Sequence, residues 1–495
     1  MTEISALCRE IDLLASEVRR EGNARADAWA DSLLRPGFPE SATNLAHYLA
    51  LRRHDLRPLQ RQLMLLGLSS LGRLESRVLP TLLAVRAALA ALAGRPPGDS
   101  PPNEWFFAGE QRLAERTREV FGPASPNRPV HLLVTCPTAA ADDPGFLRDL
   151  AARGVEAVRI NCAHDDAGVW QRMIDNTRAA EQATGRRFKI LMDLAGPKIR
   201  TGDVRVAEGK KKVHRGDLLA VVPPGGLARL EMSPPTPAAP AFAMECTLPE
   251  ALQAAKPGHH LFLDDGKLAA VVEQTADWGL TARVTAAADK GVRLKPEKGL
   301  NFPDSDLRVA ALTEKDLADL DFVAREADGI GYSFVQSPDD VALLQNALAE
   351  RRPDDWWRLS LVLKIETPKA VKNLPDILVR AAGRQPTAVM IARGDLAVEI
   401  GFARLAEMQE EILWIGEAAH VPVIWATQVL ESLIKKGRPS RGEMTDAAMA
   451  ARAECVMLNK GPHLLDAIAE LDTLLQRMEQ HQHKKTPQLR RLQSW

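Results

Sequence analysis

The amino-acid sequence predicts an α/β protein built on a (β/α)8 TIM barrel, with a small β-domain inserted in the barrel and a helical N-terminal domain before it. Eight short apolar segments follow one another from residue 131, separated by patterns typical of helices. Each segment ends in polar residues, and such a barrel carries its active site at the carboxyl ends of its strands. Between the third and fourth segments, about 95 residues lack helical periodicity and are rich in turn-forming residues.

Composition limits the class of protein. The chain has 495 residues, of which 45% are hydrophobic, with 64 basic and 65 acidic side chains. It is long enough for two or three domains, and its balanced charge gives no overall field for nucleic acid or anionic lipid. The first residues lack the apolar segment of a signal peptide, and no stretch approaches a membrane span of roughly 18 apolar residues. Five cysteines without zinc-type spacing suit a reducing compartment, so we expect a cytoplasmic protein that binds neither nucleic acid nor membrane.

Residues 1–125 are predicted to form the helical domain. Apolar side chains recur there at spacings of three and four, which is typical of amphipathic helices. These positions are Leu59, Leu63, Leu66, Leu71, Leu74, Val78, Leu82, Val85 and Leu89. Gly94 and the proline-rich residues 95–104 should end the last long helix, and a further helix over 110–121 leads into the barrel. Because apolar stripes need a partner surface, we expect a homo-oligomer.

The barrel strands are predicted from short apolar runs bounded by polar residues. The eight runs are 131–134, 155–160, 189–192, 329–332, 361–365, 388–391, 421–426 and 455–458. A single polar residue at a strand end is commonly a cap or a turn residue. Polar residues at the ends of eight successive strands are better explained by an active site.

The insertion after the third strand is predicted to be a β-domain over residues 203–297. Its turn-forming segments include residues 233–240, which read SPPTPAAP. Removing it leaves 129–202 and 298–478, about 255 residues, against the roughly 250 expected for such a barrel. A domain over the carboxyl face of the barrel could act as a lid that excludes water. Residues 479–495 are expected to be a tail.

The strand ends carry residues suited to phosphoryl transfer. Glu366 and Asp395 follow adjacent strands and offer hard carboxylate oxygens for Mg²⁺. Lys364 lies two residues before Glu366, so on a strand it points to the same face. With Arg159 and Arg200 from other strand ends, the set can position a phosphoryl group and neutralise its charge. The alternative is a buried structural ion network built from the same side chains.

Several motifs make the chain resemble pyruvate kinase from about residue 130 to 478. They are RIN with His164 at 159–164, MDLAGPKIRTG at 192–202, DDGKL at 264–268, KGLNFP at 298–303, TEKDLADL at 313–320, LKIET at 363–367, IARGDLAVEIG at 391–401 and WATQVLESLIKKGRPSRGEMTDAA at 425–448. The resemblance implies a barrel with a β-domain lid after the third strand. It also implies the last step of glycolysis, in which the phosphoryl group of phosphoenolpyruvate passes to ADP to give pyruvate and ATP.

The resemblance implies roles for individual residues. Glu366 and Asp395 would bind the divalent cation, Mg²⁺ or Mn²⁺. Lys364 would stabilise the phosphoryl group during transfer, and Arg159 would contact phosphate. Thr427 would lie near the enolate carbon that accepts a proton, as part of a relay.

The same resemblance implies the binding residues. The backbone N–H groups of Gly394 and Asp395, at a helix N-terminus, would bind the substrate carboxylate. Asn161, His164 and Arg200 would line the nucleotide side of the site.

One substitution in the family motif bears on monovalent cations. Members that need K⁺ hold it with Asn, Ser, Asp and Thr and carry glutamate in the motif that here reads GPKIRTG. This chain keeps Asn161 and Asp193 but has Ala163 and Leu194 at the serine and threonine positions. Lys198 replaces the glutamate, as in potassium-independent members. We therefore expect that K⁺ is not required and that the Lys198 ammonium substitutes for it.

Two departures from the family leave alternatives open. Family members usually carry a C-terminal effector-binding domain, whereas about 17 residues follow the last predicted barrel helix here, so we expect no regulation of that kind. The loop after the eighth strand reads Asn459-Lys460-Gly461-Pro462 in place of the usual Ser-Gly-Glu-Thr. An enolate-forming Mg²⁺-dependent lyase or aldolase on the same barrel, or a catalytically silent binding protein, therefore remains an alternative.

Overall fold

A computed structural model gives the fold and describes residues 3–96, 100–230, 240–307 and 309–487. Eight parallel strands form a closed barrel in the order β1-β15-β14-β13-β12-β11-β3-β2, which confirms the predicted fold class. The strands are β1 His131–Thr135, β2 Ala157–Asn161, β3 Lys189–Asp193, β11 Gly329–Tyr332, β12 Ser360–Ile365, β13 Thr387–Ala392, β14 Val423–Ala426 and β15 Cys455–Leu458. Each overlaps its predicted segment, although β2 and β14 begin two residues later than predicted.

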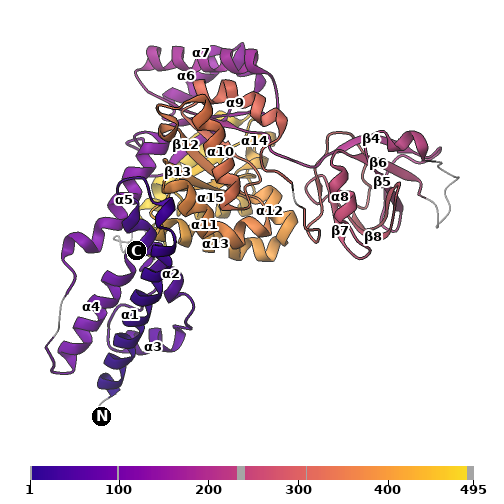
Figure 1. The fold of residues 1–495 in the computed structure, drawn as a ribbon. Helices are drawn as coiled ribbons and strands as arrows, with labels where there is room; N and C mark the ends of the chain where they lie inside the picture. The colour runs from indigo at the N-terminus through magenta and orange to yellow at the C-terminus, as the bar shows by residue number, and fades with distance from the viewer. Residues whose placement is uncertain (1–2, 97–99, 231–239, 308, 488–495) are drawn as a thin grey trace.

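Helices cover the outside of the barrel (Figure 1). They are α6 Pro144–Ala152, α7 Ala167–Thr184, α9 Glu314–Glu326, α10 Pro338–Arg351, α11 Pro368–Ala382, α12 Arg393–Ile400, α13 Phe402–Ala418, α14 Glu431–Lys436, α15 Arg441–Ala450 and α16 Leu464–Glu479. Capping boxes at Thr313, Ser337 and Ser440 fix where three of them begin. Because both faces of the barrel wall are covered, β1 and β13 are buried along their whole length.

The insertion folds as a sheet of seven strands in the order β10-β7-β8-β9-β5-β6-β4. Its elements are β4 Thr201–Val206, β5 Leu218–Val222, β6 Phe242–Cys246, α8 Pro249–Ala254, β7 His260–Leu263, β8 Leu268–Ala276, β9 Gly279–Ala287 and β10 Leu300–Asn301. It has its own hydrophobic core, which includes Phe242, Met244 and Leu261. Figure 1 shows it to one side of the barrel, joined by two connections. The sheet extends beyond 203–297 at both ends. Residues 231–239, which include most of the predicted proline-rich turn at 233–240, lie outside the described residues.

Five helices precede the barrel: α1 Glu3–Ala28, α2 Pro39–Leu51, α3 Arg57–Leu65, α4 Val78–Leu92 and α5 Asn103–Phe121. The predicted apolar stripe runs through Leu71 and Leu74, but α4 begins only at Val78. The left-handed backbone of Leu71, with φ of 57°, breaks the helix there, although both leucines are buried. Helix α5 begins inside the predicted proline-rich linker, of which residues 97–99 lie outside the described part.

A short hairpin follows α16, where the sequence predicted only a tail. Its strands are β16 Gln482–His483 and β17 Thr486–Pro487, and residues 488–495 lie outside the description. Between the strands, the Lys485 ammonium pairs with Glu75 of the helical region. The hairpin near the C-terminal end therefore contacts the helical region just before α4.

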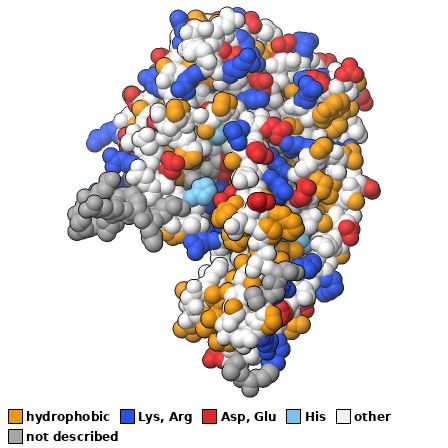
Figure 2. Space-filling model, turned by 90° about the vertical axis from the view of Figure 1, so that its left-hand side faces the viewer, with side chains coloured by type: hydrophobic (Ala, Val, Ile, Leu, Met, Phe, Trp, Pro, Cys, Tyr) orange, Lys and Arg blue, Asp and Glu red, His pale blue; other side chains and the backbone are white. Residues whose placement is uncertain are grey.

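No helix in the described part of the chain combines the length and the apolar character needed to cross a membrane. On the face shown in Figure 2, basic and acidic side chains alternate, while hydrophobic side chains gather on its lower part, over the helical region. The exposed large hydrophobic residues of that region include Leu13, Leu34, Leu65, Trp105 and Phe107. The helical region thus has apolar surface that its own packing does not cover.

Candidate active site

A buried aspartate links the ends of three barrel strands. Asp193, at the end of β3, is 2% exposed. Its Oδ2 accepts a hydrogen bond of 2.7 Å from Nε of Arg159 and lies 3.7 Å from Nζ of Lys364. Arg159 also donates from Nη1 to the Thr135 hydroxyl, at 3.2 Å. The structure thus brings together Arg159 of β2 and Lys364 of β12, as the sequence predicted.

Lys364 and Glu366 form the centre of the site. The Lys364 ammonium lies 3.1 Å from Oε1 of Glu366 and donates a hydrogen bond of 2.7 Å to the Ser333 hydroxyl. The backbone N–H of Phe334 donates to the other Glu366 oxygen, at 2.6 Å. Burial raises the pKa of Glu366, Lys364 opposes that rise, and Asp395 adds to it. Glu366 is thus a buried carboxyl group whose ionised form would be stabilised by any additional positive charge.

Asp395 meets a lysine from the insertion side of the site. Nζ of Lys198 donates to Oδ1 of Asp395 at 2.8 Å. Burial lowers the pKa of Lys198, but the carboxylates of Asp395, Glu366 and Asp265 together more than offset this, and the pKa is raised. Lys198 is therefore held inside the site as a cation.

The donor set fits a divalent cation at Glu366 and Asp395. Both offer hard carboxylate oxygens, and the repulsion that Asp395 exerts on Glu366 is what a bound cation would relieve. Within the described ranges, no group of three or more His, Cys, Asp or Glu side chains is arranged as a complete protein cage. Two protein carboxylates with the remaining positions open are typical of Mg²⁺ that also binds substrate phosphates.

The loops after β13 and β14 are tied together. The backbone N–H of Gly394 donates a hydrogen bond of 2.8 Å to the Thr427 hydroxyl. Arg393 donates from Nε to the Ala426 carbonyl and from Nη2 to the Thr427 carbonyl, at 2.9 and 2.7 Å, and it pairs with Asp446. Thr427 has a φ of 62°, a conformation that is uncommon for a β-branched residue and that these contacts maintain.

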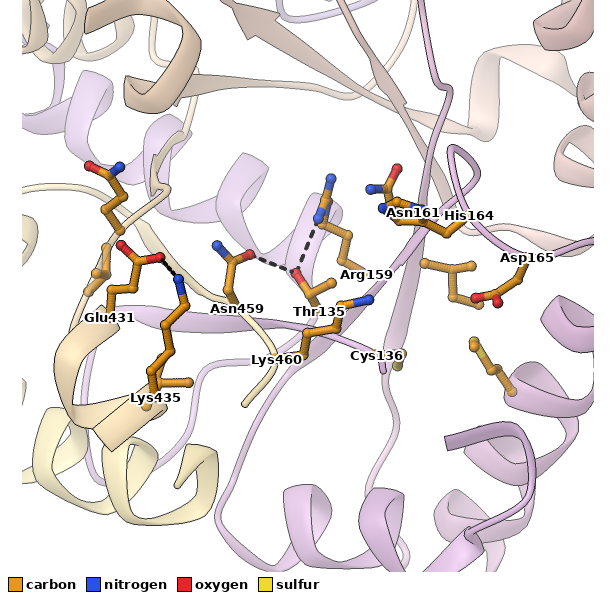
Figure 3. Close-up of a pocket in the computed structure, with 15 residues that line it drawn as sticks. Thr135, Cys136, Arg159, Asn161, His164, Asp165, Glu431, Lys435, Asn459 and Lys460 are labelled. Atoms are coloured by element: carbon orange, nitrogen blue, oxygen red, sulfur yellow. Dashed lines mark hydrogen bonds and ion pairs between the residues drawn. The ribbon is translucent and has the colours of Figure 1, made fainter. Parts of the chain in front are cut away.

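A cavity of about 330 Å³ opens beside Arg159 (Figure 3). Asn161 and His164, which are expected on the nucleotide side of the site, line it together with Lys435 and Lys460. Figure 3 shows Asn459 and Thr135 between the α14 side and Arg159, joined by hydrogen bonds. Burial lowers the pKa of His164, and the charge of Lys460 lowers it further. The wall carries Arg159, Lys435 and Lys460 against Asp165 and Glu431, and Lys435 pairs with Glu431. The small excess of positive charge favours an anionic ligand.

Arg200 lies apart from this cavity. Its backbone forms an antiparallel β-bridge with Gly299, where the chain enters and leaves the insertion. Its side-chain Nη1 donates a hydrogen bond of 3.1 Å to the Glu297 carbonyl. It is not among the residues that line the 330 Å³ cavity, although its charge also lowers the pKa of His164. In this structure Arg200 contacts the connections of the insertion rather than the other predicted nucleotide residues.

The sequence places Ser333, Asp193 and Lys460 at strand ends, where an active site is expected, but indicates no individual role for them apart from Asp193 in K⁺ binding, and it gives no signal for Lys435. Ser333 accepts the Lys364 hydrogen bond and donates to the Leu194 carbonyl at 2.7 Å, so it connects Lys364 to the end of β3. The position of Ser333 at a strand end was a usable signal, whereas Lys435 lies on a helix, where most lysines are solvent-exposed.

The sequence of the chain is similar to those of known proteins. The family model described as pyruvate kinase, barrel domain, matches residues 127–462. Pyruvate kinases from Methylorubrum extorquens, Agrobacterium vitis and Corynebacterium glutamicum are 33%, 31% and 32% identical to the chain. These alignments cover 69%, 70% and 68% of this chain and 66%, 67% and 67% of the relatives. The chain thus spans about two thirds of the length of the curated relatives it matches.

Proposed function

Because the chain belongs to the pyruvate kinase family, we propose that it transfers the phosphoryl group of phosphoenolpyruvate to ADP and releases pyruvate and ATP. The observation that carries the proposal is the position of Lys364, which is held between Asp193, Glu366 and Ser333 at the carboxyl face of the barrel. A cation fixed by three buried or half-buried groups is preorganised to stabilise charge on a transferring phosphoryl group.

In the proposed mechanism, Arg159 and Lys364 contact the phosphoryl oxygens. The bond between the phosphorus and the enol oxygen breaks as an oxygen of the ADP β-phosphate forms a new bond to phosphorus. The protein contributes position and positive charge, since this reaction needs little covalent chemistry from side chains. Asp193 orients both cations from one oxygen.

Glu366 and Asp395 would hold the divalent cation, Mg²⁺ or Mn²⁺. When bound, it would neutralise negative charge on the phosphoryl oxygens and orient them for transfer. Asp395 keeps its Oδ2 for this purpose, because Lys198 uses Oδ1.

The enolate left after transfer takes a proton on carbon. We assign Thr427 to the relay that supplies it, since the Thr427 hydroxyl lies 2.8 Å from the N–H of Gly394 at the start of α12. The N–H groups of Gly394 and Asp395 would bind the substrate carboxylate. The nucleotide would occupy the cavity lined by Asn161 and His164; Arg200 would contact it only if its side chain left the Glu297 carbonyl.

K⁺ would not be required. The Lys198 ammonium already lies 2.8 Å from Asp395, and Ala163 and Leu194 offer no side-chain oxygen for a monovalent cation. Kinetics with K⁺ replaced by tetramethylammonium at constant ionic strength should show rates within a few-fold of each other. A large loss of rate without K⁺ would refute this part of the proposal.

A coupled assay that measures pyruvate formed from phosphoenolpyruvate and ADP tests the main proposal. A lyase or aldolase would release pyruvate or an enolate product without consuming ADP, and a silent binding protein would give no product. Pyruvate and ATP formed in equal amounts support the proposal, and any other result rejects it.

The proposal includes a cytoplasmic location and a homo-oligomer. The five cysteines are buried free thiols, which suits a reducing compartment. The apolar surface of the helical region suits contact between copies. Light scattering on the full chain and on a chain lacking residues 1–125 should give different oligomeric states, whereas identical states would remove the helical region from assembly.

A further inference from the structure

The loop after β14 has a strained backbone. Thr427, Gln428 and Leu430 have φ angles of 62°, 56° and 49°. The left-handed region is unfavourable for most residues other than glycine, so surrounding contacts must hold three such residues within four positions. This loop carries the hydroxyl that we assign to the proton relay. The contacts that hold the loop therefore decide where that hydroxyl lies.

Arg393, the first residue of α12, supplies two of these contacts. The residue is 8% exposed. Its Nε donates to the Ala426 carbonyl at 2.9 Å, and its Nη2 donates to the Thr427 carbonyl at 2.7 Å. The guanidinium lies over the buried ring of Trp425, 4.7 Å from the ring centroid. Arg393 thus fixes the backbone at the end of β14 and at the first strained residue of the loop.

Asp446 of α15 fixes Arg393 in turn. Its two carboxylate oxygens accept hydrogen bonds from Nη1 and Nη2 of Arg393, and the bond from Nη2 is 2.9 Å long. Such a bidentate pair specifies the plane of the guanidinium. Helix α15 is itself anchored, because Glu443 in its first turn accepts from the N–H of Ser432 and completes a capping box with Ser440. Asp446 therefore holds Arg393 from a fixed helix.

These contacts distinguish the roles of Arg393 and Thr427. Arg393 donates four hydrogen bonds within the fold, from the five N–H groups of its side chain, so little donor capacity is left for a substrate. The Thr427 hydroxyl accepts from the N–H of Gly394 at 2.8 Å and donates to no other group in the described chain. Its own hydrogen is therefore available to a ligand.

We propose that Arg393 and Asp446 are positioning residues for protonation of the enolate, an inference that rests on the proposed function. In that step the Thr427 hydroxyl gives its proton to the enolate carbon. The electron pair of the carbon–carbon double bond forms the new C–H bond, the enolate oxygen becomes the carbonyl oxygen, and the Thr427 oxygen regains a proton from water. Arg393 does not touch the substrate and acts through Thr427, by holding the loop in its strained conformation.

Two rates measured on the full chain test the proposal. ATP formed in a single turnover of phosphoenolpyruvate and ADP reports phosphoryl transfer. Exchange of the methyl hydrogens of pyruvate for deuterium in D₂O, with Mg²⁺ and ATP present, reports proton transfer, since the same groups act in both directions.

Arg393→Lys should separate the two rates. A lysine lacks the planar fork that joins both carbonyls to Asp446. Methyl exchange should therefore fall about tenfold or more, whereas single-turnover ATP formation should stay within about threefold of the parent. Phosphoryl transfer is spared because Lys198 still holds Asp395. Asp446→Asn should lower exchange in the same direction by a smaller factor, and it decides the test if the lysine variant does not fold.

A double variant and a control locate the effect. Thr427→Val leaves only the slower exchange that water supports, and adding Arg393→Lys should not lower it further, because Arg393 acts through Thr427. Arg404→Lys, at an exposed position of α13, should leave both rates at the parent values.

Equal losses of both rates, or a further loss in the double variant, would make Arg393 a general support of the fold and reject the proposal. A parent chain that forms ATP, with variants that exchange normally, would reject this inference alone. A parent chain that forms no ATP would reject the proposed function as well.

Discussion

A buried group of charged side chains lies at each end of strand β2. The two groups differ in how the hydrogen-bonding capacity of their carboxylate is used. At the amino end, Glu156 accepts hydrogen bonds from the backbone of Ser125 and Leu132 and from both terminal nitrogens of Arg128, at 2.8 to 3.1 Å. At the carboxyl end, Arg159 shares Asp193 with Lys364. The amino-end carboxylate uses all its capacity within the fold, whereas the carboxyl-end cations share one carboxylate oxygen and Arg159 also lines a cavity.

This difference distinguishes a structural pair from the set of residues that we propose to be catalytic. A pair that is completed by backbone donors is specific to one folded arrangement, and removing one partner leaves a buried charge. A set in which two cations share one carboxylate oxygen keeps positive charge available for a ligand. The alternative of a structural ion network therefore fits Glu156 and Arg128 better than Lys364 and Glu366.

The variant Lys364→Met is expected to have the largest effect of those that test this comparison. An apolar side chain of similar length removes the charge that would meet the moving phosphoryl group, so kcat should fall by roughly 10²- to 10³-fold or more. The chain should still fold, because Asp193 keeps its hydrogen bond from Arg159 and Glu366 keeps the Phe334 N–H, but the loss of the cation beside the buried Glu366 should lower the melting temperature. Steady-state kinetics and thermal unfolding measure the two effects. Activity within a few-fold of the parent would remove Lys364 from the chemistry.

The complementary change is Arg128→Met at the amino end. It leaves the buried Glu156 without its cation, which should cost roughly 3–5 kcal/mol of stability. Since Arg128 lies far from the catalytic groups, kcat per folded molecule should match the parent at a temperature where the variant is folded. Denaturant unfolding and active-site titration check this. A large loss of kcat with unchanged stability would reverse the assignment of the two pairs.

How much of this contrast the sequence could predict depends on how far apart in the sequence the contacting residues are. Strand ends such as Arg159 and Lys364 were predictable because apolar runs end locally in polar residues. The sharing of Asp193 was not, since β2, β3 and β12 become neighbours only when the barrel closes. The same reason hid the Lys485 pair with Glu75, whose residues are 410 positions apart. The contacts of Arg200 with the connections of the insertion were not predictable either, because a motif fixes its place in the chain and not the contacts of a long side chain.

A smaller effect is expected from Glu366→Gln, which tests the metal assignment. A neutral amide is a poorer ligand for a hard cation, so the Mg²⁺ concentration for half-maximal rate should rise about tenfold or more. The amide also removes a negative charge beside Lys364, and kcat should fall as well. Activity measured across a Mg²⁺ titration gives both values. Glu156→Gln is the matched control at the other end of β2, and its metal requirement should equal that of the parent.

A titration that matches the parent would take Glu366 out of the metal site. In that case Asp395 alone would remain from the predicted pair. The contrast between the two ends would then rest on Lys364 and Arg159, without a metal in the catalytic set.

The smallest effect concerns a half-buried carboxyl that has no cation beside it in the described part of the chain. Glu399 of α12 accepts a hydrogen bond of 2.9 Å from Asn301 of the insertion, and burial raises its pKa to about 7. The folded state therefore holds this proton between about pH 4.5 and 7, while the unfolded state releases it. Stability should then fall as pH rises through that window, by roughly 1–3 kcal/mol, and level off above it.

Glu399→Gln should flatten this slope, whereas Glu350→Gln on the exposed side of α10 should keep it. Urea unfolding at pH 5, 6, 7 and 8 measures the three slopes. Equal slopes for all three proteins would show that Glu399 ionises freely and that its contact with Asn301 does not depend on the proton.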